Sequence, residues 1–414
     1  MKKLFDSVLT RLIRQGCLRV TWPDGSSSLY QGTEWPEAAF KLRDSATVRR
    51  LAMNPALVLG EAYMDGGLEP VECGIYDVLK VMISNYAGAP SHPLLRVHQM
   101  ARGAFRRLHQ FNNPLRSRAH VAHHYDLDSR LYRLILDKDQ QYSCAYFKHG
   151  DETLEEAQLA KKRLIARKLL LTQPDLRVLD IGCGWGGMAR TLASEFGARV
   201  HGITLSTEQL DHARQAAQAA GLADRVTFEL ADYRHIDQSF DRIVSVGMME
   251  HVGIANYDKF IGVVRKCLTP DGVALIHHIG RTDGPGSTNP WLSKYIFPGG
   301  YSPALSEVMP AIERSGLMTT DIEVLRMHYA RTIEHWRARF GAHRDEICAM
   351  YDERFCRMFE FYLAAVELAF IYEQHVVFQI QLSPNQTSLP LTRDYIYAGG
   401  DKNPTPVLAR SLAE

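Results

Sequence analysis

The chain contains Val178-Leu179-Asp180-Ile181-Gly182-Cys183-Gly184-Trp185-Gly186-Gly187, an apolar segment that runs directly into a cluster of glycines. The residues that follow, Gly187–Phe196, have the spacing of a helix. Glycines are needed where the backbone turns sharply and a ligand approaches it closely. The stretch therefore predicts a buried strand, a ligand-binding glycine turn and a helix behind the turn.

Short apolar runs alternate with helical patterns on both sides of this stretch. Alternation of this kind implies an α/β fold with a mainly parallel, doubly wound sheet and its site at the carboxyl ends of the strands. A long insertion at about 280–375 looks largely helical and should cover that site. The expected strands are Arg177–Gly182, Arg199–Thr204, Val226–Leu230, Phe240–Val246, Gly272–Ile279 and Val376–Leu382, and the expected helices are Gly187–Phe196, Ser206–Ala220 and a helix near Tyr257–Leu268.

The composition places the chain among ordinary globular proteins. It has 414 residues, 46% of them hydrophobic and 23% charged, which excludes disordered, collagen-like and coiled-coil chains. The length predicts two domains, or one domain with an extension. The net charge of +1 argues against nucleic acid as a partner. No apolar stretch reaches signal-peptide or transmembrane length.

The seven cysteines are scattered and include no CxxC pair. This pattern argues against a zinc site or a disulfide framework and favours a reducing cytoplasm.

Positive charge is concentrated in one segment. Residues 78–125 contain no Asp or Glu but seven Lys and Arg, which leaves −6 for the rest of the chain. Apolar residues recur there at helical spacing from Leu94 to Phe111, so we expect a basic amphipathic helix with flanks. Such a helix would bind an anionic membrane surface; the alternative is a solvated interdomain linker.

Residues 1–85 look like a small mixed module. Leu18–Trp22 and Ser28–Tyr30 are expected strands on either side of a turn, and a helix is expected around Leu57–Tyr63.

The glycine turn alone does not identify its ligand, because NAD, FAD and S-adenosylmethionine all bind to such turns. Dinucleotide folds place an acid at the end of the second strand. Here that end is Gly202-Ile203-Thr204-Leu205-Ser206, and no carboxylate follows until Glu208. Asp180, ahead of the turn, suits the cationic sulfonium and amino group of S-adenosylmethionine.

Several segments together resemble the cyclopropane-fatty-acyl-phospholipid synthases, a methyltransferase family that includes the mycolic-acid cyclopropane synthases. The resemblance extends in family order over residues 123–300 and back to Gly60–Gly66. The segments that carry it are His123–Leu127, Gln141–Phe147, Gly182–Gly187, Thr204–Gln209, Asp232–Arg234, Val244–Gly253, His277–Gly280 and Lys294–Gly300.

The resemblance implies a Rossmann-like class I methyltransferase domain at 123–414, preceded by a basic amphipathic linker at 91–122 and a small N-terminal module at 1–90 for lipid docking or dimerisation. The reaction would add a methylene from S-adenosylmethionine across a cis double bond of an unsaturated acyl chain in a membrane phospholipid. A carbocation would form and lose a proton to bound bicarbonate. The enzyme would be cytoplasmic, peripherally bound to the anionic inner face of the cell membrane, and homodimeric.

Site residues carried over from the family fall into two sets. The catalytic, bicarbonate-binding set is Cys144, Glu250, His277, Ile279 and Tyr329, with Cys144 and Ile279 acting through backbone groups. The cofactor set is Tyr142, Ser143, Asp180, Gly182, Gly184, Thr204, Ser206, Gln209, Asp232, Tyr233 and Arg234. No metal ligand is implied.

Several of these residues could instead have a structural role. Cys144 could simply pack in the hydrophobic core. Glu250 could cap a helix, and Gln209 could be the capping-box partner of Ser206. His277 and His278 invite a metal site, but adjacent strand residues face opposite sides, so His278 is expected to be structural. Four aromatics would line an acyl channel or face the cation: Tyr146, Phe147, Tyr295 and Phe297.

The sequence is also compatible with other functions. A methyltransferase of the same fold could make methyl-branched fatty acids without closing the ring, or methylate an amine. A degenerate lipid-binding protein is a different class, and the intact Gly182–Gly187 turn, Glu250 and His277 argue against it.

Overall fold

A computed structural model describes residues 1–33, 35–86 and 129–397. These residues form two compact units. The first contains the described residues up to 86 with Ser287–Pro298 and Ala330–His375, and the second contains 129–286, Gly299–Tyr329 and 376–397. Two segments that the sequence analysis placed in the 123–414 domain, Ser287–Pro298 and Ala330–His375, are thus grouped with N-terminal residues.

The first unit combines a small sheet with helices from both ends of the chain. Its four strands lie in the order β2-β1-β3-β4, with β1 antiparallel to β2 and parallel to β3. The predicted N-terminal hairpin and the helix around Leu57–Tyr63 are confirmed. The elements are α1 (Lys2–Leu12), β1 (Cys17–Thr21), β2 (Ser27–Gln31), β3 (Glu37–Leu42), α2 (Ser45–Met53), α3 (Pro55–Met64), β4 (Leu68–Pro70), α4 (Ile75–Tyr86), α13 (Pro290–Tyr295), α15 (His328–Ala342), α16 (Arg344–Met350) and α17 (Glu353–Tyr372). The first two residues of α15, His328 and Tyr329, belong to the second unit.

Helix α13 packs directly on α3. A Cβ atom at Gly60 would lie 2.3 Å from the Trp291 ring, so only glycine permits this contact. Beside it the buried carboxyl of Glu61 accepts hydrogen bonds from Lys294 at 2.7 Å and from the Tyr295 hydroxyl at 3.0 Å. Two of the segments that carry the family resemblance, Gly60–Gly66 and Lys294–Gly300, therefore meet in this unit.

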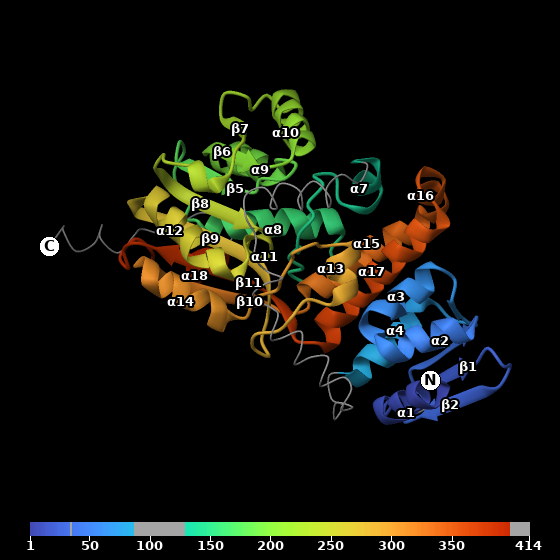
Figure 1. Ribbon diagram of the computed structural model, residues 1–414. Helices are drawn as coiled ribbons and strands as arrows, with labels where there is room; N and C mark the ends of the chain where they lie inside the picture. The colour runs from blue at the N-terminus through green and yellow to red at the C-terminus, as the bar shows by residue number, and fades with distance from the viewer. Residues whose placement is uncertain (34, 87–128, 398–414) are drawn as a thin grey trace. The chain divides into compact units, whose positions relative to one another are not determined.

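The second unit is built on a seven-stranded sheet in the order β10-β11-β9-β8-β5-β6-β7 (Figure 1). The neighbouring strands β7, β6, β5, β8 and β9 are all paired in parallel. Strand β10 is antiparallel to β11. The elements are α7 (Ser129–Ile135), α8 (Leu154–Lys168), β5 (Arg177–Ile181), α9 (Gly187–Phe196), β6 (Arg199–Thr204), α10 (Thr207–Ala219), β7 (Val226–Leu230), η1 (Tyr233–His235), β8 (Phe240–Val246), α11 (Met249–Val252), η2 (Ile254–Asn256), α12 (Tyr257–Cys267), β9 (Leu268–Arg281), α14 (Leu305–Ser315), β10 (Met318–Leu325), β11 (His375–Ser383) and α18 (Asp394–Tyr397).

The strands and helices expected between 177 and 268 are confirmed, and the mainly parallel sheet with them. The insertion at 280–375 was expected to be largely helical, and there the prediction was incomplete, because β10 (Met318–Leu325) lies within it. This strand is an edge strand whose residues are mostly half-buried, including Thr319, Thr320 and Asp321. An edge strand of this kind lacks the strict polar–apolar alternation that reveals a strand in sequence.

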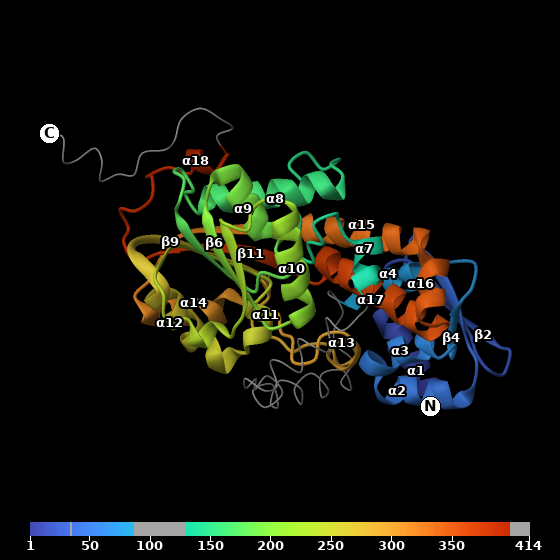
Figure 2. The ribbon, with the colours of Figure 1, turned by 90° about the horizontal axis from the view of Figure 1, so that it is seen from above.

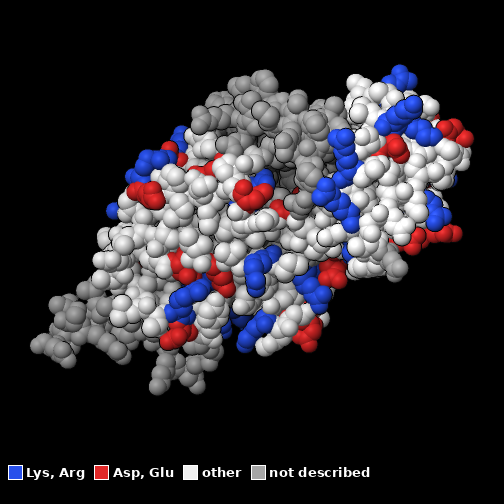
Figure 3. Space-filling model, turned by 90° about the horizontal axis from the view of Figure 1, so that it is seen from below, with Lys and Arg blue, Asp and Glu red and all other residues white. Residues whose placement is uncertain are grey.

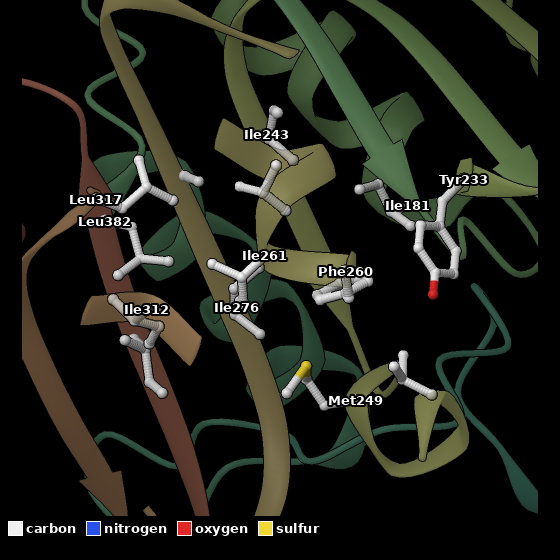
Figure 4. Close-up of a cluster of buried hydrophobic side chains, with 14 of the residues drawn as sticks. Ile181, Tyr233, Ile243, Met249, Phe260, Ile261, Ile276, Ile312, Leu317 and Leu382 are labelled. Atoms are coloured by element: carbon white, nitrogen blue, oxygen red, sulfur yellow. The ribbon is translucent and has the colours of Figure 1, made fainter. Parts of the chain in front are cut away.

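Two apolar clusters hold helices against opposite faces of the sheet, as Figure 2 shows for α8 and α9 on one side and α12 and α14 on the other. Alternate strand residues join the two clusters: Leu179 and Ile276 pack with α11, α12 and α14, whereas Val178 and Leu275 pack with α8, α9 and α10. Figure 4 shows the first cluster, with Met249, Phe260 and Ile261 beside Ile276 of the sheet. Asp180 and His277 share the face of Val178 and Leu275.

The described surface carries mixed charge, with basic and acidic side chains interspersed on the face shown in Figure 3. Exposed ion pairs such as Arg314–Asp258 and Arg163–Glu195 are part of this pattern. Within the described ranges no helix is long and apolar enough to cross a membrane. The predicted amphipathic segment at 91–122 and the motif His123–Leu127 both lie outside the described residues.

Candidate active site

The glycine turn leads from β5 into α9 at the carboxyl edge of the sheet. Gly182, Gly184 and Gly186 all have left-handed backbone angles, with φ of +82°, +54° and +79°. A Cβ at Gly186 would lie 2.7 Å from the Phe228 ring, whereas one at Gly184 would meet no described atom within 4 Å. Gly186 is therefore required by packing, while Gly184 borders open space that a ligand could fill.

Asp180 lies just ahead of this turn and is buried, with 2% of its surface exposed. Its Oδ2 has no hydrogen-bond partner among the described residues. Burial raises the pKa of this carboxyl to about 7, and the nearby charge of Lys161 acts in the opposite direction. A buried carboxyl with an unused oxygen is prepared to receive a cationic or hydrogen-bond-donating ligand.

Lys161 on α8 is fully buried and holds the segment that contains Tyr142, Ser143 and Cys144. Its Nζ donates to Gln141 Oε1 at 2.7 Å and to Ser143 Oγ at 2.9 Å. One turn earlier on the same helix, Gln158 Nε2 donates to the Ser143 carbonyl at 2.8 Å. Burial lowers the pKa of Lys161 to about 8, although neighbouring acids favour its charge.

A second set of charges fastens this segment to the glycine turn. Asp139 pairs with Lys162 of α8 and, at 2.7 Å, with Arg190 of α9. Arg190 also donates to the Trp185 carbonyl at 2.9 Å. A Cβ at Gly187 would lie 2.4 Å from Gln141 Nε2, so the segment and the start of α9 approach each other closely.

Thr204 and Gln209 meet at the carboxyl end of β6. Thr204 Oγ1 donates to Gln209 Oε1 at 2.9 Å, and both side chains are buried. Ser206 caps α10 by accepting from the Gln209 N–H at 3.3 Å, but the Ser206 N–H donates to Thr204 Oγ1 instead of to Gln209. The expected capping box is thus only half formed, because the Gln209 side chain is directed to Thr204.

Asp232 and Arg234 form a bidentate salt bridge just after β7. Arg234 Nε and Nη2 contact the two carboxylate oxygens at 2.8 and 2.5 Å, and Asp232 also accepts from the Arg234 N–H at 3.0 Å. The Tyr233 ring between them packs edge-on against Phe260 at 5.1 Å in the hydrophobic cluster. The role of these three residues beside adenine stays a prediction.

Glu250, on α11 directly after β8, is buried and bound to the backbone of β9. Its Oε1 accepts from the Ile279 N–H at 2.6 Å, and its Oε2 has no hydrogen-bond partner among the described residues. Burial raises the pKa of this carboxyl to about 7, against the effect of the Ile279 hydrogen bond. Glu250 therefore presents one oxygen that can accept, or donate when protonated.

His277 sits where β9 passes the end of β8, opposite Val246. Its Nδ1 lies 3.1 Å from Gln379 Nε2 of β11. Burial and the positive charges of Lys161 and Lys168 hold the pKa of His277 well below its ordinary value, so the ring is neutral. His278 points to the other face, where its ring contacts Phe378 at 5.6 Å.

The remaining catalytic candidates are buried in the same unit. Cys144 is 1% exposed and its Sγ approaches the Ala145 carbonyl at 3.3 Å, while Tyr329 is 7% exposed. Tyr142 contributes a ring 5.5 Å from that of Tyr132. The described residues contain no group of three or more His, Cys, Asp or Glu arranged to hold a metal ion.

The four predicted channel aromatics divide between the units. In the second unit Tyr146 stacks on His328 at 4.9 Å, and the Phe147 N–H donates to His328 Nδ1 at 3.1 Å. In the first unit Phe297 packs edge-on against Tyr362 at 5.7 Å, and Tyr295 bonds Glu61. Their role as channel walls stays a prediction.

Comparison with known proteins decides the family. A family model described as mycolic acid cyclopropane synthetase matches residues 113–380, and a domain of unknown function matches residues 4–90. The cyclopropane-fatty-acyl-phospholipid synthase of Escherichia coli strain K12 is 39% identical over 350 residues, covering 84% of this chain and 88% of that protein. The chain belongs to the mycolic acid cyclopropane synthetase family.

Other members of the cyclopropane synthetase family extend the comparison. The tuberculostearic acid methyltransferase UfaA1 of Mycobacterium tuberculosis is 32% identical over 385 residues, which is 88% of each chain. The solved structure of mycolic acid cyclopropane synthase CmaA1 with SAH and CTAB is 33% identical, has a TM-score of 0.61, and covers 64% of this chain and 97% of that one. The predicted class I methyltransferase fold is confirmed, and the chain is an enzyme, a methyltransferase of this family.

The cyclopropane synthetase site fits S-adenosylmethionine in three respects. Open space borders Gly184, as a ligand lying on the turn requires. Asp180 offers a buried, unused carboxylate oxygen for a cationic ligand. The Gln209 carbonyl oxygen is held by Thr204, which leaves the amide nitrogen as a donor.

Of the five residues predicted to bind bicarbonate, Glu250 and His277 have groups that could do so. The backbone N–H of a third, Ile279, is already used. Glu250 Oε2 and the neutral ring of His277 are both available. The Ile279 N–H is not, because it donates to Glu250. A backbone contact at Ile279 would therefore fall to its carbonyl oxygen, which lies 2.8 Å from His278 Nδ1 and has a second lone pair for a bicarbonate hydroxyl.

Sequence reasoning missed the buried lysines of α8. Lys161 and Lys168 are two helical turns apart and lie, like Leu154 and Leu164, on the buried side of the helix. Lysine at an apolar position of a helix is the signal that could have identified them.

Proposed function

We propose that this protein transfers a methylene from S-adenosylmethionine to the cis double bond of an unsaturated acyl chain in a membrane phospholipid, forming a cyclopropane ring. The observation that carries the proposal is the buried Glu250 carboxyl, with one oxygen bound to Ile279 and the other without a partner among the described residues. A family relative with this activity in its name covers most of the chain.

The chain's own residues would bind the cofactor and orient it. Asp180 attracts the positive charge of the methionine end, and Ser143, held by Lys161 and Gln158, fixes the segment beside it. Thr204 and Gln209 form a prepared pair at the end of β6. S-adenosylmethionine supplies the methyl group on a sulfonium, whose position relative to the alkene sets the rate, since an alkene is a weak nucleophile.

A proton must leave the new methyl group for the ring to close. Bicarbonate, when bound, supplies the base for that proton. Around it His277 donates a hydrogen bond, Glu250 orients the anion through its free oxygen, and the ammonium of Lys161 compensates the negative charge nearby. The buried surroundings also exclude water, which would otherwise capture the carbocation as an alcohol.

A second candidate is methyl branching without ring closure. It is favoured by the 32% identity to a tuberculostearic acid methyltransferase over most of both chains. Both reactions begin with the same methyl transfer and differ in the fate of the cation. Product analysis distinguishes them, because a ring adds one CH2 and leaves no double bond.

Replacement of Glu250 tests the proposal. Glu250→Gln keeps an acceptor for the Ile279 N–H but cannot supply a carboxylate, so ring formation should fall at least about a hundredfold. Affinity for S-adenosylmethionine, measured by calorimetry, should change little. Glu229→Gln removes an exposed carboxyl at the end of β7 and serves as the matched control. Full ring yield from Glu250→Gln on unsaturated vesicles would remove Glu250 from the site.

The proposal also covers where the enzyme acts and what each part of the chain does. We infer a cytoplasmic enzyme bound peripherally to the anionic inner face of the membrane through the basic segment at 91–122. The module at 1–90 would serve lipid docking or homodimerisation, and residues 123–414 would carry the chemistry. The absence of acids between Val78 and Tyr125 supports this assignment.

A further inference from the structure

A chain of buried polar groups runs behind His277. Lys168, at the end of α8, has no exposed surface. Its Nζ pairs with the Glu323 carboxylate of β10 and donates to Gln379 Oε1 of β11 at 2.7 Å. Gln379 in turn contacts His277 Nδ1 at 3.1 Å through its Nε2. Four elements, α8, β10, β11 and β9, thus contribute one group each.

The orientation of the Gln379 amide follows from its partner. An ammonium can only donate, so the amide oxygen must face Lys168. Burial lowers the pKa of Lys168, and the ion pair with Glu323 opposes this shift and favours the charged form. The amide NH2 group then faces His277 Nδ1, which must accept. Reversing the amide would set the NH2 group against an ammonium and leave a buried donor unsatisfied.

This contact determines where the proton of a neutral His277 resides. Because Nδ1 accepts, the proton is on Nε2. Nε2 makes no hydrogen bond with any residue in the described ranges, although the ring is 2% exposed. The nitrogen that carries the proton is therefore also the one free to engage a ligand.

We propose that Lys168 and Gln379 are positioning residues that hold His277 as its neutral Nε2–H tautomer, so that Nε2 donates a hydrogen bond to an anion in the site. The inference deepens the proposed function and rests on it for the identity of the anion. Neither residue touches the reacting atoms, and both act through the histidine. The tautomer itself follows from the hydrogen bonds alone.

The test is nitrogen NMR of the full-length protein with labelled histidine, in which His277→Asn assigns the signals of this ring. The native ring should show a proton-free Nδ1 and a protonated Nε2. Gln379→Glu is close to isosteric: its carboxylate still accepts from Lys168 but requires a proton on Nδ1. Its spectrum should therefore show Nδ1 protonated, and ring formation should fall at least about tenfold with unchanged KM for S-adenosylmethionine.

Gln381→Glu is the matched control. Gln381 lies two residues along β11 on the same face, but its Nε2 donates to the Lys168 carbonyl at 2.5 Å and to the Tyr395 hydroxyl. This variant should leave the His277 signals unchanged. Lys168→Met provides a second perturbation and should produce a mixture of the two tautomers, because the amide is then free to reverse. Thermal unfolding and cofactor affinity establish that each variant is folded.

The possible outcomes separate the two proposals. Native-like His277 signals in Gln379→Glu would overturn the inference, as would protonated Nδ1 in the native protein. A tautomer switch without loss of ring formation would overturn the positioning role. If the native protein shows the Nε2–H tautomer but forms no ring on any lipid, the proposed function fails while the assigned hydrogen bonds stand.

Discussion

Asp180 and Glu250 are two buried carboxyls at adjacent strand ends of a parallel sheet, and each has an oxygen without a partner among the described residues. Such groups cost stability, since a buried carboxylate is poorly solvated. Burial raises the pKa of both to about 7. The proposed function accounts for both acids: Asp180 would face the cationic cofactor and Glu250 the reacting centre.

The pKa of Glu250 has a consequence for stability. The unfolded chain releases this proton near pH 4.5, whereas the native protein keeps it to about pH 7. Native stability therefore declines as the pH rises through that window and then levels off. Glu250→Gln lacks this titration, so its stability relative to the native protein should increase between about pH 5 and pH 8, by at most about 3 kcal/mol. Urea unfolding at both pH values measures the difference, and a constant difference would contradict the raised pKa.

For individual residues, the sequence predicted which side chains lie near the strand ends but not which hydrogen bonds they form. Asp180 was predicted from its place ahead of the glycine turn, whereas Thr204, Glu250 and His277 were carried over from the family resemblance. A backbone group of Ile279 was expected to bind the anion, and the structure shows that its N–H donates to Glu250. Hydrogen-bond partners between distant segments depend on side-chain orientation, which motif spacing does not determine.

Among the elements, α8 carries the buried lysines that bond Gln141, Ser143 and Gln379. Its capping box at Thr153 and Glu156 is a local signal that the sequence contains. Its buried lysines have partners far along the chain, namely Gln141, Ser143, Gln379 and Glu323. A lysine at an apolar helix position signals burial but not the partner: those of Lys168 come from β10 and β11, and β10 was itself not predicted.

Lys161→Met tests the role of α8 in cofactor binding. The variant loses two hydrogen bonds from a charged group and raises the pKa of Asp180 further, so Asp180 no longer attracts a cation. Affinity for S-adenosylmethionine should fall about tenfold or more, the equivalent of one charged hydrogen bond. Arg163→Met, which removes an exposed cation from the same helix, should leave the affinity unchanged. Equal affinities for the two variants would show that Lys161 does not support the site.

For the whole molecule, the net charge of +1 conceals an uneven distribution. Residues 78–125 hold seven positive charges without an acid, and the described surface outside them carries mixed charge. The proposed substrate is a lipid in a bilayer, so the proposed function requires a surface that binds the membrane. The proposal assigns this role to the basic segment, which would contribute about 1 kcal/mol for each basic residue near an anionic surface.

Charge reversal tests this membrane assignment. Changing Arg102, Arg106 and Arg107 to Glu should lower binding to anionic vesicles at least about tenfold. Binding to the soluble cofactor should be unaffected, because these residues lie far in sequence from the glycine turn. Co-sedimentation at low and high salt measures the effect. Native-level sedimentation of the triple variant with anionic vesicles would refute the assignment.

Incubation of the purified protein with methyl-labelled S-adenosylmethionine and unsaturated phospholipid vesicles, followed by fatty-acid analysis, tests the central claim most directly. Label is expected in a cyclopropane ring, with a gain of one CH2 and loss of the double bond. Label in a methyl branch, or no transfer to lipid by protein that binds the cofactor, would contradict it.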